Sequence, residues 1–471
     1  MSKSSTSRPS GPEATSRPSG SEATSRPSRP ETASINELLG SATDAVDIAR
    51  RAGAQDAWAS LSRDRSVSHT YRDGKIEKVE ESTSRGLGIS LYVDDRYSSH
   101  STTDLRPDRL AAFIREAVAL TRALQPDPHR KIPDPALFQG RPTVDLERKD
   151  PSLADLTPQQ REAWCAEMDA RAHSDKRVIS AESGLFSGES QGASASSNGF
   201  SGTWEGGYIG YNCTATVREG EDKRPEGSAS VVGRFLAGLP EPTKIAEKAL
   251  KRTLDRLGSK KGPTIRATMV VDPEAAISLI SRALGPASAA AIQQGRSFWA
   301  GKIGQPLLGD KLTVTDEPLI PRGLGSRHFD GEGIAAKRIP IIERGVVRNL
   351  YVDTYYGRKL GMAPTTGSAS NRVVALGDHN LAELLAQAGS GIYVTSWLGG
   401  NSDSTTGDFS LGLRGHLIEN GKIGAPIGEM NVTGNLPTLY KSLIAVGNDP
   451  YPYSSLRAPT LVFENVQFSG A

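Results

Sequence analysis

Cysteine is nearly absent from this sequence, since only Cys165 and Cys213 occur among its 471 residues. Two cysteines exclude a disulfide framework and a metal site built mainly from thiolates. Long apolar runs are absent as well, because no stretch approaches the about 18 residues that a membrane-spanning helix needs. The first residues are polar and lack the apolar core of a signal peptide. We therefore expect a cytoplasmic protein with no membrane segment.

An excess of charge of one sign is also missing. The chain has 56 Lys and Arg against 54 Asp and Glu, which leaves a net charge of +2. This balance gives no general attraction to nucleic acid or to an anionic membrane. Aromatic residues make up 6% of the chain and are not interleaved with basic ones, as they are in single-strand nucleic-acid binders. The composition therefore predicts neither a nucleic-acid nor a membrane partner.

Closely spaced histidines, which zinc peptidases commonly place on one helix, are missing too. The nearest two, His100 and His129, are 29 residues apart. The pattern predicts no metal site, and a site assembled from distant histidines is the less favoured alternative. We interpret all seven as surface or loop residues: His69, His100, His129, His173, His328, His379 and His416.

One serine motif is present. Residues 188–192 read GESQG and match the G-x-S-x-G pattern of a nucleophile elbow centred on Ser190. That elbow requires a buried strand before the serine and a helix after it. Residues 193–197 read ASASS and favour no helix. A polar turn is therefore the preferred interpretation, and a nucleophile is the alternative.

Other signals of chemistry are weak. Cys213 lies in a strand-like segment with no neighbour that would lower its pKa, so a buried thiol is predicted. Residues 295–302 lack the spacing and the hydroxyl of a phosphate loop, and Gly323-x-Gly325 lacks the third glycine of a dinucleotide-binding motif. The residues alone predict no catalytic residue, no cofactor-binding residue and no metal ligand in this chain.

The chain divides into a tail and two domains. Residues 1–33 carry a nine-residue repeat of Ser, Arg and Pro that cannot bury a core, so we predict a disordered tail, with partner docking as the alternative. An N-terminal domain with an antiparallel sheet is expected over residues 34–258, and a β-rich C-terminal domain over 259–471. Segment 259–263, which contains Gly and Pro, marks the boundary. The predicted fold class is α+β.

Local signals place several elements in these domains. Ser34 and Glu37 form a capping box at the start of a helix. Asp272 caps a later helix that begins at Pro273. The turns at residues 343–345 and 419–422 predict hairpins, since Asn-Gly tolerates positive φ. Helices are predicted over residues 34–53, 107–124, 157–168 and 245–258, a half-buried strand over 87–93, and exposed or edge strands with turns over 187–211.

The C-terminal half contains a series of short motifs. They are FDGEG (329–333), IERGVV (342–347), RKLGM (358–362), TGSA (366–369), GDFS (407–410), GHLIENGK (415–422), GNL (434–436) and VGND (446–449). In the N-terminal half, a strand with the sequence RGLGI at residues 85–89 is followed by TDL at 103–105. In their order and number these motifs resemble the TldD/TldE family, and specifically its TldE (PmbA) branch. The resemblance extends from about residue 35 to the end of the chain.

The resemblance implies a subunit without its own zinc site. The TldD branch carries HExxxH on a helix early in the C-terminal domain and a late cysteine, and these residues bind zinc. The corresponding helix here is the one beginning at Asp272-Pro273, and the motif window falls at Ser281–Pro286. The window contains neither histidine nor glutamate, and residues 450–455 contain no cysteine. Zinc is therefore expected in a partner subunit.

The resemblance also implies a partner and a class of substrate. A TldE-like chain pairs with a TldD-like subunit that bears HExxxH, and the pair acts on unfolded or short peptides, including precursors of peptide natural products. The alternatives are a stand-alone peptide-binding scaffold, also as a homodimer, and a peptide-modifying protein of a natural-product pathway.

Several segments are candidates for contact with a peptide, because an extended peptide can add to a β-sheet as a strand. Gly206-Gly207 and Gly399-Gly400 would allow close approach of its backbone, with ordinary turns and bulges as the preferred alternative. Asp408 and Ser410 would line a channel, with stabilisation of a turn preferred.

Overall fold

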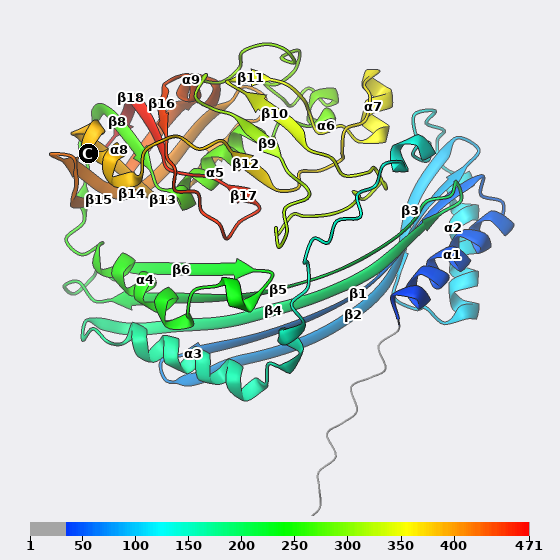
Figure 1. Cartoon of the computed structure of the whole chain (residues 1–471), viewed down its shortest axis with the longest axis horizontal. Helices are drawn as coiled ribbons and strands as arrows, with labels where there is room; N and C mark the ends of the chain where they lie inside the picture. The colour runs from blue at the N-terminus through cyan, green and yellow to red at the C-terminus, as the bar shows by residue number, and fades with distance from the viewer. Residues whose placement is uncertain (1–33, 471) are drawn as a thin grey trace, which may run out of the picture. The chain divides into compact units, whose positions relative to one another are not determined.

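The N-terminal half of the chain is built on a six-stranded antiparallel sheet in the order β3-β2-β1-β4-β5-β6 (Figure 1). The structure is a computed structural model that describes residues 34–470, so the predicted tail, residues 1–33, lies outside the described residues. The strands are β1 (Asp56–Arg72), β2 (Lys75–Val93), β3 (Arg96–Thr102), β4 (Val178–Ser196), β5 (Ser201–Val217) and β6 (Glu226–Gly233). Successive side chains of each strand point to opposite faces, so the sheet has two distinct surfaces.

Helices cover one face of this sheet, because every second strand residue there is apolar. α1 and α3 pack on β1 and β4, α2 packs on β2 and β3, and α4 packs on β5 and β6. On β2, for example, Leu87, Ile89, Leu91 and Val93 are all buried. The helices are α1 (Ile35–Arg51), α2 (Pro107–Arg122), α3 (Pro158–Ala172) and α4 (Pro242–Leu254), and 3-10 turns occur at Pro135–Phe138, Pro151–Asp155 and Leu236–Gly238.

The C-terminal half contains a seven-stranded and a five-stranded sheet. In the larger sheet β18 pairs with both β8 and β15, so five strands close into a ring without a free edge. Its order is β16-β18-β8-β13-β14-β15-β7, with β7 (Lys260–Lys261), β8 (Ile265–Val271), β13 (Gly391–Ser402), β14 (Asp408–Glu419), β15 (Lys422–Asn435), β16 (Leu443–Val446) and β18 (Leu461–Ser469). The smaller sheet has the order β11-β10-β9-β12-β17, with β9 (Val314–Asp316), β10 (Ile339–Glu343), β11 (Val346–Val347), β12 (Arg372–Val374) and β17 (Leu456–Arg457).

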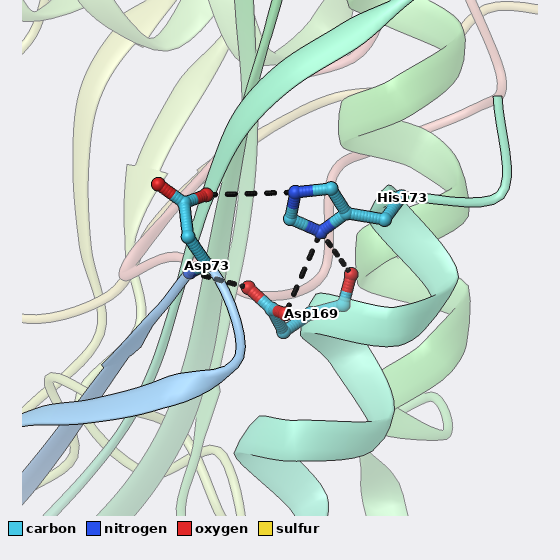
Figure 2. A group of neighbouring side chains, drawn as sticks. All are labelled: Asp73, Asp169 and His173. Atoms are coloured by element: carbon cyan, nitrogen blue, oxygen red, sulfur yellow. Dashed lines mark hydrogen bonds and ion pairs between the residues drawn. The ribbon is translucent and has the colours of Figure 1, made fainter. Parts of the chain in front are cut away.

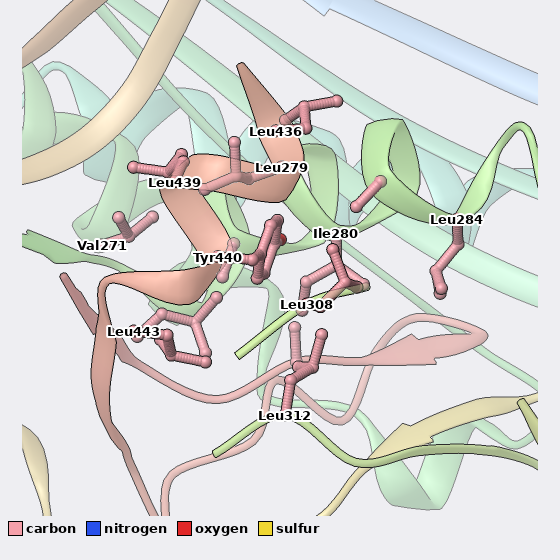
Figure 3. Packing of buried hydrophobic residues seen from close by; sticks show 14 of the residues in the cluster. Val271, Leu279, Ile280, Leu284, Leu308, Leu312, Leu436, Leu439, Tyr440 and Leu443 are labelled. Atoms are coloured by element: carbon pink, nitrogen blue, oxygen red, sulfur yellow. The ribbon is translucent and has the colours of Figure 1, made fainter. Parts of the chain in front are cut away.

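Helix α5 (Pro273–Leu284) lies within the C-terminal core (Figure 3). The Asp272 side chain accepts a hydrogen bond from the backbone N–H of Glu274 at 2.9 Å, which caps the helix. Leu279 and Ile280 are fully buried and share one apolar cluster with Leu436 and Tyr440. The remaining helices are α6 (Ala289–Gln293), α7 (Thr354–Leu360), α8 (Leu381–Ala388) and α9 (Leu436–Lys441).

Most predicted elements are confirmed, and so is the α+β class. Helices α1 to α5 lie where local signals place them, and Asn420 and Gly421 have φ of 51° and 73°, as a type I′ hairpin requires. The predicted boundary between residues 258 and 259 stays a prediction. Among residues 34–470, no helix combines the length and the apolar content needed to cross a membrane.

Two expectations about elements are wrong. Residues 187–211 do not form edge strands with turns, because they lie in the inner strands β4 and β5, which one turn at 197–200 connects. Only one face of these strands is apolar, so the usual signal of a buried strand is weak. The helix predicted over residues 107–124, with Leu124 expected on its buried side, ends at Arg122, and Leu124 follows it and is exposed.

Candidate functional site

The face of the six-stranded sheet opposite the helices is lined by small polar residues and glycine. Directly paired residues share a face, so Asp64, Ser84, Ser190 and Gly206 lie in one row across four strands. We call this surface the serine face. Its residues include Ser60, Ser62, Asp64, Ser66 and Ser68 of β1, Ser82, Ser84, Gly86, Gly88 and Ser90 of β2, Gly188, Ser190, Gly192 and Ser194 of β4, and Trp204, Gly206, Tyr208 and Gly210 of β5.

The C-terminal half contacts the serine face through aromatic side chains. Trp58 stacks on Phe200 with ring centroids 4.6 Å apart, and Phe200 meets Phe329 edge-on at 5.2 Å. A Cβ atom at Gly202 would lie 2.7 Å from the Phe329 ring, so glycine allows this approach. The aromatic contacts therefore fix one end of the face against the C-terminal half.

The motif at residues 329–333 is organised by the buried carboxylate of Asp330. One of its oxygens accepts the backbone N–H groups of Glu332 and Ile334, at 2.9 and 3.0 Å. The other accepts the Thr366 hydroxyl and the Gly367 N–H, both at 2.9 Å. These bonds connect two of the sequence motifs and hold Phe329 in position, so the role that the structure gives Asp330 is structural.

A cavity of about 300 Å³ opens on the serine face around Ser190. Gly188 pairs with Tyr208, and Gly192 pairs with Trp204, on either side of the Ser190–Gly206 pair. A Cβ atom at Gly188 would lie 2.5 Å from the Tyr208 ring, and one at Gly192 would lie 2.2 Å from the Trp204 ring. The two rings therefore lie against glycine backbone and flank a floor made by Ser190 and Gly206.

Two arginine side chains lie over this floor. A Cβ atom at Gly206 would be 3.1 Å from Nη1 of Arg234 and 3.5 Å from Nη2 of Arg148. Arg234 is fixed by the backbone carbonyls of Gly207 and Leu324, which accept its Nη1–H and Nη2–H at 2.9 and 2.6 Å. Burial and the charge of Arg148 lower the pKa of Arg234 to about 10. Burial also lowers the pKa of Arg148. The cavity therefore presents two closely spaced cations.

The serine motif has a structural explanation in this geometry. Ser190 lies in the middle of strand β4, so the expected polar turn is wrong, and no helix follows that could form a nucleophile elbow. The described residues that line the cavity include no histidine to act as a base. The two glycines of the motif make room for Tyr208 and Trp204. The period-two pattern Gly188-x-Ser190-x-Gly192 opposite Trp204-x-Gly206-x-Tyr208 was the available signal for this site, which sequence reasoning missed.

The window Ser281–Pro286 spans the end of α5. Ala283 and Leu284 are buried in the core, and the carbonyl oxygen of Ala283 accepts the indole N–H of Trp299 at 2.9 Å. Arg282 points the other way, and its Nη1–H donates to the Ser402 hydroxyl at 3.1 Å. This window contains no imidazole, thiol or carboxylate, the groups that bind zinc.

Within residues 34–470, one cluster has the composition of a metal site: Asp73, Asp169 and His173 (Figure 2). Both carboxylates of this cluster already accept hydrogen bonds from backbone N–H groups. Asp169 accepts the backbone N–H groups of Asp73 and Gly74, both at 3.1 Å, and Asp73 accepts the Ala181 N–H at 2.8 Å. The His173 ring nitrogens lie 3.5 Å from each carboxylate. Since Asp73 and Gly74 have positive φ, the cluster stabilises the β1–β2 turn.

The remaining candidates have mixed outcomes. Cys213 is a buried thiol, as predicted, and burial raises its pKa to about 12. The interpretation as surface or loop histidines is wrong for His69, which is buried in β1, and for His100 and His416, which are half-buried in strands β3 and β14. Burial lowers the pKa of the His69 and His416 rings.

The two glycine pairs and Asp408 have the structural roles that were the preferred alternatives to contact with a peptide. Gly399-Gly400 forms a bulge where the register between β13 and β14 shifts. At Gly207 the backbone N–H and C=O bond to Arg148 and Arg234, so the edge of β5 is not free there. Asp408 accepts hydrogen bonds from Thr406 and Asn435, at 2.8 and 3.0 Å, which stabilise the turn before β14.

Family models of PmbA/TldA metallopeptidases match three segments of the chain. The model of domain 1 matches residues 59–121, that of the central domain matches 151–257, and that of the C-terminal domain matches 264–470. The chain is 28% identical over 426 residues to Metalloprotease PmbA of Escherichia coli O157:H7, covering 88% of this chain and 92% of that protein. It is 27% identical over 442 residues to a PmbA homologue of Haemophilus influenzae, covering 93% and 97%.

Solved structures have the same fold. A Bacteroides thetaiotaomicron protein described as a candidate modulator of DNA gyrase is 38% identical, with a TM-score of 0.89 over 92% of this chain and 98% of that one. TldE from Thermococcus kodakarensis is 19% identical, with a TM-score of 0.81 over 91% of this chain and 100% of that one. At 19% identity, the second likeness is one of fold.

Proposed function

The chain belongs to the TldD/TldE (PmbA) metallopeptidase family, and from this premise we propose that it is a TldE-like subunit without zinc of its own. In this proposal it acts in the cytoplasm and presents unfolded or short peptides to a TldD-like partner that bears HExxxH. Hydrolysis takes place at the partner's zinc ion. This chain binds and orients the peptide next to that site.

The observation that carries the proposal is the composition of the Ser281–Pro286 window. Catalytic zinc needs three protein ligands, drawn from imidazole, thiolate and carboxylate groups. The window offers a serine hydroxyl and a guanidinium in their place, and the guanidinium of Arg282 is bonded to Ser402. The side chains of Ala283 and Leu284, in the same window, are buried in the apolar core.

The serine face supports the peptide-binding part of the proposal. Serine and glycine leave room for an extended main chain whatever its side chains, and each hydroxyl both donates and accepts hydrogen bonds. Cross-strand bonds such as Ser60 Oγ to Ser194 Oγ, at 2.6 Å, hold part of the face in order. A surface of this kind would bind many peptide sequences with little selectivity.

The proposal is tested with the purified full chain, alone and mixed with an HExxxH-bearing relative from the same genome. Zinc is measured by mass spectrometry, and cleavage is measured with an unfolded, fluorescently labelled protein. We expect no stoichiometric zinc and no cleavage from the chain alone, and cleavage together with co-elution on gel filtration when the partner is added. The matched control is a partner whose HExxxH glutamate is replaced by glutamine, which should still co-elute but not cleave.

Two results would contradict the proposal. The first is zinc bound by the isolated chain together with cleavage of the unfolded protein. The second is a chain that neither co-elutes with any HExxxH-bearing relative nor increases its activity, which would favour a stand-alone scaffold.

A further inference from the structure

The cavity around Ser190 contains two arginine side chains that form no ion pair in the described structure. Arg148 and Arg234 both reach over Gly206, and neither forms an ion pair among residues 34–470. Two acidic residues lie nearby without pairing with these arginines: Glu205 pairs with Lys149 at 3.4 Å, and Asp64, which lines the cavity, accepts the Ser62 hydroxyl at 3.2 Å. Two like charges held close together in a partly buried site repel each other, and an anion bound between them would offset this repulsion.

The two arginines have different roles. Three backbone carbonyls, of Gly207, Gly323 and Leu324, hold Arg234, so its position is set by the fold. The Arg148 side chain makes no hydrogen bond in the described part of the chain, and its Nε is buried without a partner. Arg148 is therefore free to bind a ligand, whereas Arg234 is a fixed cation beside it.

The shape of the cavity favours a carboxylate attached to an organic group over a bare ion. Guanidinium groups match the planar geometry of a carboxylate, and the Ser190 hydroxyl on the floor is a further donor. Tyr208 and Trp204 form two apolar walls about this charged region. A volume of about 300 Å³ holds a group of the size of one amino-acid residue.

We propose that the cavity binds a carboxylate of a peptide through Arg148, Arg234 and Ser190, with the adjoining residue between Trp204 and Tyr208. The carboxylate is the peptide's C-terminus or the side chain of an Asp or Glu. This inference rests on the proposed function and deepens it, because it adds one anchoring site for an acidic group to a face that otherwise has little selectivity. An anchored carboxylate would also fix the direction and register of the bound peptide.

The test uses the full chain and fluorescence anisotropy with three labelled peptides of one sequence that otherwise lacks acidic residues. The first has a free C-terminus, the second is amidated, and the third is amidated but contains one internal Glu. We expect at least one of the two acidic peptides to bind about tenfold more tightly than the neutral one. The first and third peptides distinguish a C-terminal from a side-chain source of the carboxylate.

Variants of the chain make the test specific to the cavity. Arg148→Gln should remove the preference for acidic peptides, and Arg148→Lys should keep part of it. Arg115→Gln is the matched control, because Arg115 is exposed on α2, which packs on the other face of the sheet, and should leave the preference unchanged. Among residues 34–470 the Arg148 side chain makes no hydrogen bond, and its backbone carbonyl, which accepts the Gly207 N–H, is kept in the variants. The variants should therefore fold, which circular dichroism checks.

The outcomes separate this inference from the proposed function. Equal binding of all three peptides would overturn the carboxylate site and leave peptide binding intact. A preference that persists in Arg148→Gln would also overturn it. If none of the peptides binds, the proposed presentation of peptides fails as well. Displacement by millimolar inorganic phosphate with no preference among peptides would identify a site for small anions only.

Discussion

At the scale of single residues, glycine on the serine face is required where an aromatic ring lies against the backbone. A Cβ atom at Gly192 would lie 2.2 Å from Trp204 and 2.7 Å from the backbone oxygen of Leu61, which cannot move aside. Gly88 lies on the same face, and nothing lies within 4 Å of its Cβ position. The two positions therefore form a matched pair that separates crowding from the general effect of replacing glycine in a strand.

We predict that Gly192→Ala lowers the free energy of unfolding by about 1–3 kcal/mol, the usual cost of overpacking. Gly88→Ala should change it by about 0.5 kcal/mol or less, because the methyl group enters open space. Urea unfolding followed by tryptophan fluorescence and by circular dichroism measures both changes. Equal effects of the two variants would show that Trp204 does not lie against Gly192.

The serine motif shows the limit of residue patterns. The sequence Gly188-x-Ser190-x-Gly192 is compatible with a nucleophile elbow and equally with a strand. Only the structure of the neighbouring residues distinguishes these two possibilities. Trp204, Gly206 and Tyr208 decide between them, because they pair with the motif across β4 and β5. The contribution of Arg148 and Arg234 was not predictable, since it depends on contacts with segments distant in the sequence.

At the scale of elements, helices α4 and α5 are joined by an ion pair between the two halves of the chain. Arg252 of α4 donates from Nη1 and Nη2 to the two carboxylate oxygens of Glu274 on α5, at 3.1 and 2.8 Å, and Lys248 adds a third bond. Burial acts to raise the pKa of Glu274, but the bonds from Arg252 and Lys248 hold it below its ordinary value of 4.5.

We predict that Glu274→Gln lowers the free energy of unfolding at pH 7 by about 2 kcal/mol, the value of a charge-assisted hydrogen-bonded pair. A carboxyl whose pKa is lower in the folded state stabilises the fold above its unfolded pKa, and this contribution is lost as the pH falls through the folded pKa. The difference between wild type and variant should therefore shrink below pH 4.5. Denaturant unfolding at pH 7 and at low pH measures it.

The control for this prediction is Asp255→Asn. Asp255 pairs with Lys251 at the solvent-exposed end of α4, and exposed pairs contribute little to stability. This variant should resemble wild type at pH 7. A Glu274→Gln effect that stays constant across the pH range would mean that the ion pair is not its cause.

The elements that could be predicted are those with local signals. Thr157 and Gln160 form a capping box at α3, and Asp272 caps α5, as expected for residues whose bonds reach only the next turn. Strands β4 and β5 were misplaced because Leu185, Ala193 and Ile209 supply an apolar pattern on one face, while serine and glycine on the other resemble a loop. Their inner position in the sheet depends on pairing with β1 and β6, which no local signal encodes.

At the scale of the whole molecule, the serine face is defined by contacts between segments far apart in the sequence. Trp58 lies on β1, Phe200 precedes β5, and Phe329 belongs to the C-terminal half. The type of each residue predicts an apolar environment for it. It does not predict that the three residues contact one another. The Asp330 carboxylate places Phe329 through bonds to Thr366 and Gly367, so the aromatic cluster depends on two separate motifs.

The aromatic cluster should therefore couple the two halves energetically. Phe200 is 2% exposed, so Phe200→Ala should lower the free energy of unfolding by about 3–5 kcal/mol. In a double-mutant cycle with Phe329→Ala, we predict a coupling of about 0.5–1.5 kcal/mol, because the edge-on contact is lost in either single variant. The control cycle combines Phe200→Ala with Phe463→Ala, since Phe463 packs on Tyr440 in the C-terminal core and should be additive. Additivity of both cycles in urea unfolding would show that the contact of Phe329 with Phe200 does not join the halves.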